Sequence, residues 1–296
     1  MEYVVGVDAG GSRTRALAVA RDGRVLRTYE TRGGNLTLSR DAHDAIRDAV
    51  LAVIDPAERP AGLALCAAGE EDAAVRAGAN ALLAELVPGT RTVVANDALA
   101  GLYAASAAGV GVVIIAGTGA IAYGRTGDGR TARASGWGYL IGEEGSLMRL
   151  GCDALRAVAR AVDGLEPPTA LSGAVLRALG TSDLRGSLAA VYAPHPAPAI
   201  LAAARALAEV PDDDAAQRVV ATGANGLAEA AVAVARRLDL DDVYLAGGAF
   251  AVVPRLEIAT RERLVALEPR VRVTRVLDEP VRGAARLAAA LVWSAA

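Results

Sequence analysis

The sequence predicts an α/β protein with two domains that face each other across a cleft. Two stretches, one at the N-terminus and one near Gly109, open with apolar β-type segments and continue into turns that carry glycines. No low-complexity linker separates the two halves, and the 296 residues are 53% hydrophobic, which suits two medium domains with substantial cores. A cleft between such domains is the usual place for a small ligand. Strand-order rules alone leave a doubly wound single sheet as an alternative.

The first half has the pattern β-β-β-α-β-α-β-α. Ser39 can cap the first helix, in which apolar residues recur at helical spacing, and Asn96 or Asp97 can cap the third. The expected strands are Val4–Val7, Ala16–Ala20, Val25–Tyr29, Gly62–Ala67 and Arg91–Ala95, and the helices run from Ser39 to Ile54, from Glu70 to Leu86 and from Asn96 to Ala107.

The pattern starts again at Gly109, as a weak internal repeat of pattern rather than of residues. The expected strands here are Val110–Ala116, Ile121–Arg125, Asp242–Ala246 and Val271–Val276, and the helices include Asp212–Leu238, Pro254–Leu267 and Val281–Trp293. A helical region, broken at prolines and at Gly180, lies between Ser146 and Leu238. We therefore expect one domain from residues 1–108 plus 281–296, and a second from residues 109–280 with a helical insertion.

Composition excludes several classes of partner. The net charge of −3 argues against nucleic acid, and the longest apolar stretches are far too short to span a membrane. The N-terminus enters a strand directly, so we expect no signal peptide and a cytoplasmic protein. The isolated Cys66 and Cys152 fit a reducing compartment. Whether the chain forms a homodimer is left open.

The chain contains no lysine, so every basic residue of the sequence is an arginine. A phosphate-binding lysine of the Walker or protein-kinase type and a Schiff-base lysine are therefore impossible. Any nucleotide phosphate has to be bound by backbone, hydroxyls, arginine and metal.

The turn after the first strand has the composition of such a phosphate site. Gly10 and Gly11 allow backbone N–H groups to approach an anion, and Ser12 and Thr14 add hydroxyl donors. Asp8 at the strand end could hold Mg²⁺ through water. The alternative is an ordinary glycine-rich hairpin turn.

Similar polar or glycine-bearing strand ends recur along the chain. They are Asp8-Ala-Gly-Gly-Ser12, Asn96-Asp97, Ala116-Gly-Thr-Gly119 and Ala246-Gly-Gly248. Ligands of α/β sheets collect at the carboxyl ends of strands, so the set in this order is more specific than any one member.

With these motifs, the sequence resembles the N-acetylglucosamine kinase and BadF/BadG-type ATPase family, within the actin/hexokinase/Hsp70 superfamily. The resemblance covers nearly the whole chain and is carried most strongly by Gly136-Trp-Gly138 followed by Gly142-Glu-Glu-Gly-Ser146. It implies two ribonuclease-H-like, actin-like ATPase domains. It also implies transfer of a phosphoryl group from Mg·ATP to an amino sugar, N-acetylglucosamine first, at O6.

The resemblance implies a role for each matching residue. Asp97 would be the general base and would also contact the sugar. The other sugar contacts would be Asn35, Gly119, Ala120, Gly136, Trp137, Gly138 and Glu143, and the ATP contacts would be Gly10, Gly11, Ser12, Thr14, Gly117, Thr118, Gly119, Gly247 and Gly248. The plainer alternatives are a helix N-cap for Asp97, a loop asparagine in a turn of positive φ for Asn35 and a core aromatic at the domain junction for Trp137.

Two residues depart from the family pattern on the sugar side. Glu143 stands where Asp is common, and Ala120 stands where a polar residue is frequent. These changes leave glucosamine open as an alternative acceptor, because a carboxylate attracts an ammonium group.

Two further classes of function compete with a kinase. A BadF-type ATPase activator of a partner enzyme would need cluster-binding cysteines, whereas Cys66 and Cys152 are isolated. A sugar-sensing repressor would need a helix-turn-helix segment before the first strand, where the sequence has only Met1 and Glu2.

Overall fold

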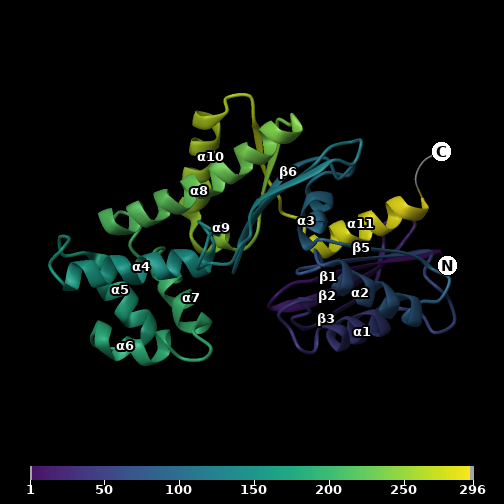
Figure 1. Ribbon diagram of the computed structural model, residues 1–296, viewed down its shortest axis with the longest axis horizontal. Helices are drawn as coiled ribbons and strands as arrows, with labels where there is room; N and C mark the ends of the chain where they lie inside the picture. Colours follow the sequence, from purple (N-terminus) through teal and green to yellow (C-terminus); the bar gives the residue numbers. More distant parts are fainter. Residues whose placement is uncertain (1, 294–296) are drawn as a thin grey trace. The chain divides into compact units, whose positions relative to one another are not determined.

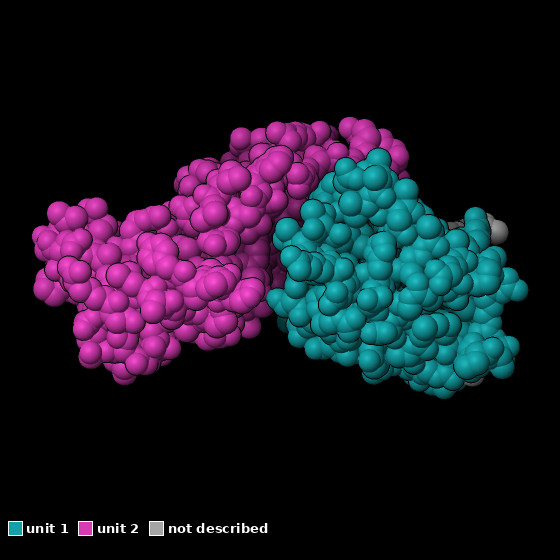
Figure 2. All heavy atoms as spheres, turned by 60° about the horizontal axis from the view of Figure 1, so that its bottom comes forward, with its two compact units in different colours: residues 1–110, 276–296 teal, residues 111–275 magenta. Residues whose placement is uncertain are grey.

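The computed structural model describes residues 2–293, and the chain divides into two compact units (Figures 1 and 2). Unit 1 is formed by residues 1–110 and 276–296, and unit 2 by residues 111–275. Within residues 2–293, no helix is long and apolar enough to cross a membrane.

Unit 1 is built on a five-stranded sheet in the order β3-β2-β1-β4-β5. Its strands are β1 (Tyr3–Ala9), β2 (Arg13–Ala20), β3 (Val25–Arg32), β4 (Gly62–Ala67) and β5 (Arg91–Ala95). The β1–β2–β3 meander is antiparallel, whereas β4 and β5 run parallel to β1. The carboxyl ends of β1, β4 and β5 therefore lie at one edge of the sheet.

Helices cover both faces of this sheet (Figure 1). On one face α1 (Ala42–Val53) and α2 (Ala73–Leu86) bury a core that includes Ile46, Leu63 and Leu83. On the other face α3 (Asp97–Ala105) and α11 (Pro280–Val292) pack over Val4, Ala64 and Cys66. The apolar residues of a strand thus alternate between two helical layers.

Three glycines allow α11 to lie directly on its neighbours. A Cβ at Gly6 of β1 would stand 2.2 Å from the Ala285 nitrogen, and one at Gly62 would stand 2.9 Å from the Ala288 oxygen. A Cβ at Gly283 of α11 would stand 1.9 Å from the Ala100 oxygen of α3. The helix is therefore fixed by backbone contacts to β1, β4 and α3, which no larger residue permits.

Unit 2 repeats the strand order of unit 1. Its strands are β6 (Gly111–Ala116), β7 (Ala120–Arg125), β8 (Thr131–Ser135), β9 (Asp242–Ala246) and β10 (Arg272–Arg275), in the order β10-β9-β6-β7-β8. The meander β6–β7–β8 is antiparallel, and β9 and β10 are parallel to β6. The weak repeat in the sequence thus corresponds to two sheets of the same topology.

The helices of unit 2 include an insertion between β8 and β9. They are α4 (Leu147–Val162), α5 (Ala170–Leu179), α6 (Leu184–Val191), α7 (Ala197–Ala206), α8 (Asp214–Leu238), α9 (Ala249–Val252) and α10 (Pro254–Leu267). The long helix α8 packs on β6, β7 and β8 and also contacts α4 and α10. One continuous core therefore joins the sheet to the inserted helices.

Local differences from the sequence prediction have simple causes. Ser39 does not cap α1: its N-cap is Asp41, whose side chain makes no cap hydrogen bond. The strand β8 was not predicted, because Thr131–Ser135 is short and contains an arginine and no large apolar residue. Asp72 caps α2 through hydrogen bonds from Ala74 and Val75, so this helix begins after the predicted Glu70.

Candidate functional site

The turn between β1 and β2 exposes backbone at the edge of the first sheet. The Gly10 N–H donates to the Arg13 carbonyl at 3.0 Å, and the Gly34 N–H donates to the Gly10 carbonyl at 3.0 Å. A Cβ at Gly33 would stand 2.2 Å from the Gly11 oxygen, so the loop after β3 needs glycine to reach the turn. Gly11 and Ser12 remain exposed, as a phosphate-binding turn requires.

The two hydroxyls of this turn have different surroundings. Ser12 is exposed, whereas Thr14 is fully buried and its Oγ1 has no hydrogen-bond partner among the described residues. A Cβ at Gly34 would stand 2.5 Å from that Oγ1. Ser12 is thus directly accessible to a ligand, whereas Thr14 Oγ1 is buried next to Gly34.

Asp8 and Asp97 lie at the same edge of the sheet. Asp8 of β1 is paired with Cys66 of β4, which is paired with Ala95 of β5, and Asp97 follows two residues later. Burial raises the pKa of Asp8 to about 7, with the nearby Asp97 carboxylate as the second cause. Burial also raises the pKa of Asp97 to about 6, with further contributions from Glu71 and Glu70.

Asn96, rather than Asp97, is the N-cap of α3. Its Oδ1 accepts from the Ala98 N–H at 2.9 Å, and its Nδ2 donates to Glu71 Oε1 at 3.0 Å. Asp97 is the first residue of the helix. The simple N-cap interpretation of Asp97 is therefore wrong, and a carboxylate with a pKa of about 6 is available for proton transfer.

The carboxylates of unit 1 fit a hydrated magnesium ion. Within the described residues, no group of three or more His, Cys, Asp or Glu side chains is arranged to hold a metal directly. Asp8, however, is partly buried beside a second carboxylate that raises its pKa. A nearby cation would favour the charged form of both groups, and Mg²⁺ commonly keeps several waters while bound by one or two carboxylates.

Asn35 uses its amide oxygen within its own loop. Oδ1 accepts from the N–H groups of Thr37 and Leu38 at 3.0 and 2.9 Å. Its φ is not positive, so it does not occupy the left-handed turn position that the simple loop interpretation assumes. The amide nitrogen is the group that Asn35 can offer to a sugar hydroxyl or acetamide.

In unit 2 the corresponding turn, Gly117–Gly119, is held by the start of α4. The Gly117 N–H donates to the Gly119 carbonyl at 2.8 Å. The first amides of α4, at Leu147 and Met148, donate to the carbonyls of Gly117 and Thr118 at 2.8 and 3.3 Å. The turn thus has a fixed backbone in a hairpin equivalent to that of Gly10 and Gly11.

Glu143 connects this turn to the Gly136–Gly138 loop. Its carboxylate accepts from the Gly138 N–H at 3.1 Å and from the Ala120 N–H, and these bonds oppose the increase in its pKa that burial causes. Glu143 has a left-handed φ of 60°, and its own N–H donates to Ser135 Oγ at 3.2 Å. The longer carboxylate therefore joins two loops that were predicted to contact the sugar.

Trp137 is 62% exposed, so it does not belong to the core of unit 2. The Arg133 guanidinium carbon lies 4.6 Å from the centre of a Trp137 ring. Leu140 and Ile141 in the same loop are 80% and 79% exposed. The loop thus presents an aromatic side chain and a cation together, a combination that the sequence did not indicate because Arg133 lies in the unpredicted strand β8.

Gly247 lies beside the Gly117 turn. Its φ is 102°, and a Cβ there would stand 2.2 Å from the Ala116 oxygen. Arg275 donates to the carbonyls of Leu245 and Gly247 at 2.7 and 3.1 Å. Gly248 is the N-cap of α9 and leaves open space at its Cα. Only small residues allow β9 to end so close to β6.

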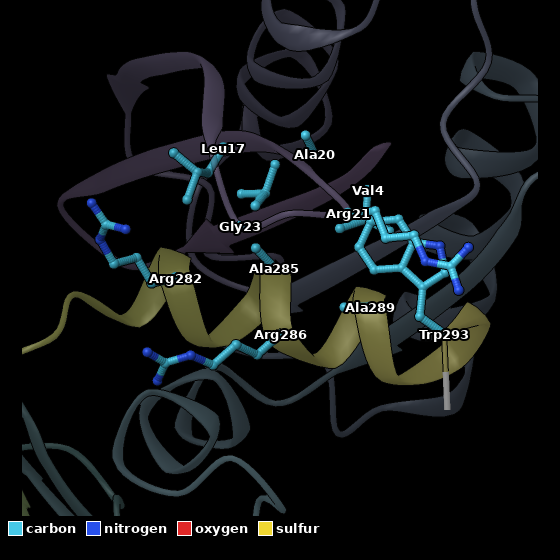
Figure 3. A pocket seen from close by; sticks show the side chains of 11 residues that line it. Val4, Leu17, Ala20, Arg21, Gly23, Arg282, Ala285, Arg286, Ala289 and Trp293 are labelled. Atoms are coloured by element: carbon cyan, nitrogen blue, oxygen red, sulfur yellow. The ribbon is translucent and has the colours of Figure 1, made fainter. Parts of the chain in front are cut away.

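Each unit therefore brings together its own share of the predicted residues. Unit 1 gathers Asp8, Asp97 and the Gly10–Ser12 turn at one edge, and unit 2 gathers the Gly117–Ala120 turn with Glu143, the Gly136–Gly138 loop and Gly247. A cavity of about 310 Å³ elsewhere in unit 1, between β2 and α11, contains none of these residues (Figure 3). Apolar side chains and three arginines line that cavity.

Two curated relatives are kinases of amino sugars. The N-acetylmuramic acid/N-acetylglucosamine kinase of Clostridium acetobutylicum is 30% identical over 182 residues, and the N-acetyl-D-glucosamine kinase of Dictyostelium discoideum is 31% identical over 196 residues. Each alignment spans 60% of this chain and 60% of the relative's length.

A solved structure matches over almost its whole length. A protein from Chromobacterium violaceum, provisionally described as an N-acetylglucosamine kinase, superposes with a TM-score of 0.74 and 26% identity over 97% of this chain and 99% of its own. This likeness confirms the predicted α/β fold of the actin-like ATPase type. The sequence also matches the BadF/BadG/BcrA/BcrD ATPase family over residues 5–284, and the chain therefore belongs to that family.

Proposed function

We propose that the protein is an ATP-dependent kinase that phosphorylates an amino sugar, with N-acetylglucosamine as the preferred acceptor and O6 as the acceptor atom. The observation that carries the proposal is Asp97, a partly buried carboxylate with a pKa of about 6 at the end of β5. An ATPase family and two amino-sugar kinase relatives support both the nucleotide and the class of acceptor.

In the proposed reaction the sugar hydroxyl loses its proton to the Asp97 carboxylate as its oxygen attacks the γ-phosphorus. The bond from the γ-phosphorus to the bridging oxygen breaks, and ADP leaves with that oxygen. The turns at Gly10–Ser12 and Gly117–Gly119 donate hydrogen bonds to the phosphates, and Gly247 and Gly248 leave room for the adenosine. Mg²⁺, held near Asp8 through water, would neutralise charge on the phosphates.

The contacts of Glu143 favour N-acetylglucosamine over glucosamine. Its carboxylate already accepts hydrogen bonds from Gly138 and Ala120, so its charge is partly compensated within the loop. An ammonium group would then gain less from this carboxylate than from a free one. Asn35 Nδ2 remains available as a donor to an acetamide oxygen.

N-acetylmuramic acid is a second candidate acceptor, because of Arg133. This sugar differs from N-acetylglucosamine by a lactyl ether that carries a carboxylate. The Arg133 guanidinium, placed over the exposed Trp137 ring, provides a cation beside the predicted sugar loop. One relative is named for both sugars.

ADP release over a panel of sugars tests the proposal. The panel contains N-acetylglucosamine, N-acetylmuramic acid, glucosamine, glucose and N-acetylmannosamine, each with Mg·ATP. We expect N-acetylglucosamine to give the highest kcat/KM. If no sugar stimulates ADP release, the kinase proposal is wrong and the alternative of a BadF-type ATPase activator gains support.

A further inference from the structure

Two segments of chain connect the units, and both leave unit 1 beside the pair α3 and α11. The first connection follows α3, which ends at Ala105, and reaches unit 2 at Gly111. The second leaves unit 2 after Arg275 and enters α11 at Pro280. The first connection therefore joins unit 1 at the C-terminus of α3, and the second joins it at the N-terminus of α11.

Arg286 of α11 contacts the last turn of α3 and the second connection with one guanidinium group. Its Nη1 donates to the carbonyls of Tyr103 and Ala104 at 3.1 and 2.8 Å, and its Nη2 donates to Asp278 Oδ2. Tyr103 and Ala104 belong to the last turn of α3, whose carbonyls have no partner within the helix. A cation is also favourable at the negative end of the helix dipole.

The contact between α3 and α11 is close along its length. At Gly283, one turn before Arg286, a Cβ would stand 1.9 Å from the Ala100 oxygen and 2.5 Å from the Ala104 nitrogen. The two helices thus have no side chain between them at this point. Arg286 adds a polar contact at the end of α3 to the steric contact in its middle.

The opposite end of α3 carries Asp97. Because α3 has only nine residues, a shift at its C-terminus is transmitted through a short rigid rod to its first residue. We infer that Arg286 is a positioning residue: by fixing the last turn of α3 to α11 and Asp278, it holds the Asp97 carboxylate in the place that proton transfer requires. The inference rests on the proposed function, in which Asp97 is the general base.

A purely structural role for Arg286 makes a different prediction. A helix cap that only stabilises the fold would lower the melting temperature when it is removed, but the folded fraction would keep its kcat. A positioning residue instead affects kcat in fully folded protein. It leaves KM for ATP nearly unchanged, since the phosphate-binding turn belongs to β1 and β2 rather than α3.

The test compares Arg286→Ala and Arg286→Lys with the control Arg282→Ala. Arg282 lies one turn earlier on α11 and is exposed, and its side chain makes no hydrogen bond or ion pair within the described residues (Figure 3). The control therefore removes the same charge from the same helix without touching α3. Steady-state kinetics below the melting temperature and hydrogen–deuterium exchange of residues 97–111 are measured for each variant.

We expect Arg286→Ala to lower kcat by roughly 10- to 100-fold, the usual effect of a misplaced catalytic group, with KM for ATP within about threefold of wild type. Arg286→Lys keeps the charge but lacks the planar guanidinium group that donates to several acceptors at once. This variant should therefore recover part of the lost kcat. Amides of α3 should exchange faster in Arg286→Ala and not in Arg282→Ala.

An unchanged kcat in folded Arg286→Ala, or an equal loss in Arg282→Ala, overturns the inference. Exchange is measured without sugar, so it remains informative if no sugar is phosphorylated. Faster exchange of α3 without any sugar-stimulated activity in the wild type would indicate that the proposed function is wrong while the contact of Arg286 is real. Unchanged exchange with an active wild type would reject the positioning role alone.

Discussion

Asp97 combines partial burial with a position at the start of a helix. Burial disfavours its charge, whereas the N–H groups of the first turn of α3 favour it, and the resulting pKa of about 6 leaves the carboxylate ionised at neutral pH. A base of this strength can accept a proton as the sugar hydroxyl attacks and release it to water afterwards.

Replacing Asp97 by asparagine tests this role. The amide keeps the volume and the hydrogen-bonding capacity of the side chain but cannot take the proton, so kcat should fall by roughly 10²- to 10⁴-fold while ATP binding persists. ADP release and nucleotide titration calorimetry measure the two effects. The control Asp72→Asn changes an exposed carboxylate that caps α2, and it should retain activity. Normal turnover by Asp97→Asn would reject the general-base assignment.

The raised pKa of Asp8 makes stability depend on pH. Its pKa is about 7 in the folded protein and near 3.8 in the unfolded chain, so folding favours the protonated form. The stabilisation is fully present below the unfolded value and is lost as pH rises through about 7.

Asp8→Asn should therefore stabilise the unliganded protein at pH 8 clearly more than at pH 5, because part of the stabilisation is already lost between pH 3.8 and pH 5. Urea unfolding at the two pH values measures the difference. Asparagine resembles the protonated carboxyl and carries no charge to desolvate at either pH. An equal change in the urea midpoint at pH 5 and pH 8 would contradict the explanation by burial.

The proposed contact of Arg133 with a sugar carboxylate can be tested by comparing two acceptor sugars. If its guanidinium binds the lactyl carboxylate, Arg133→Gln should lower kcat/KM for N-acetylmuramic acid by roughly 3- to 10-fold and leave N-acetylglucosamine unaffected. The neutral sugar serves as the internal control in the same assay. A parallel loss with both sugars would indicate instead that Arg133 supports the Trp137 loop.

At the scale of elements, the close packing of α11 depends on glycines that the sequence pattern does not distinguish from turn residues. Gly283→Val places side-chain atoms where the Ala100 carbonyl now lies. The backbone of α3 would have to move to relieve this overlap. We expect a loss of about 3 kcal/mol or more in the free energy of unfolding.

A glycine in another helix provides the control for Gly283. Gly173 in α5 is exposed, and its Cβ would meet only the flexible end of Arg177 at 3.3 Å. Gly173→Ala should stabilise the protein by roughly 0.5–1 kcal/mol because alanine favours helix. Denaturant unfolding of both variants separates steric exclusion from helix propensity; similar effects would mean that the contact between α11 and α3 is not tight.

Elements were predictable where the local pattern was strong. Gly62–Ala67, Arg91–Ala95, Asp242–Ala246 and Pro254–Leu267 have the predicted limits, because apolar runs end there at polar, proline or turn residues. The strand β8 was missed, since its pairing with β7 stabilises a segment of low intrinsic preference. Tertiary contacts of this kind leave no local signal.

The candidate site was predictable as motifs but not as contacts. Glycine turns and the Asn96-Asp97 pair predicted which strand ends carry the candidate site. The hydrogen bond from Ala120 to Glu143 joins two segments that are separated in sequence, whereas the bond from Gly138 to Glu143 and the stacking of Arg133 on Trp137 depend on the irregular path of the chain between β8 and α4. Only the folded chain brings such partners together, so a single sequence could not supply them.

At the scale of the whole molecule, the two units have equivalent sheets, each with a glycine turn after its first strand. Each unit thus carries one of the two turns proposed to bind phosphate, and the connections beside α3 and α11 join them. The proposed kinase reaction requires that attack by water on the γ-phosphate be limited when no sugar is bound.

We therefore expect the molecule to become more compact when the acceptor sugar binds. Small-angle X-ray scattering with a non-hydrolysable ATP analogue, with and without N-acetylglucosamine, measures the radius of gyration. A sugar from the panel that is not phosphorylated provides the control for solvent contrast. The acceptor should lower the radius of gyration and the control sugar should not, because only the acceptor gains from completing the site. An unchanged profile with an active enzyme would mean that water is excluded by loops within each unit, and the Trp137 loop would then be the first segment to test.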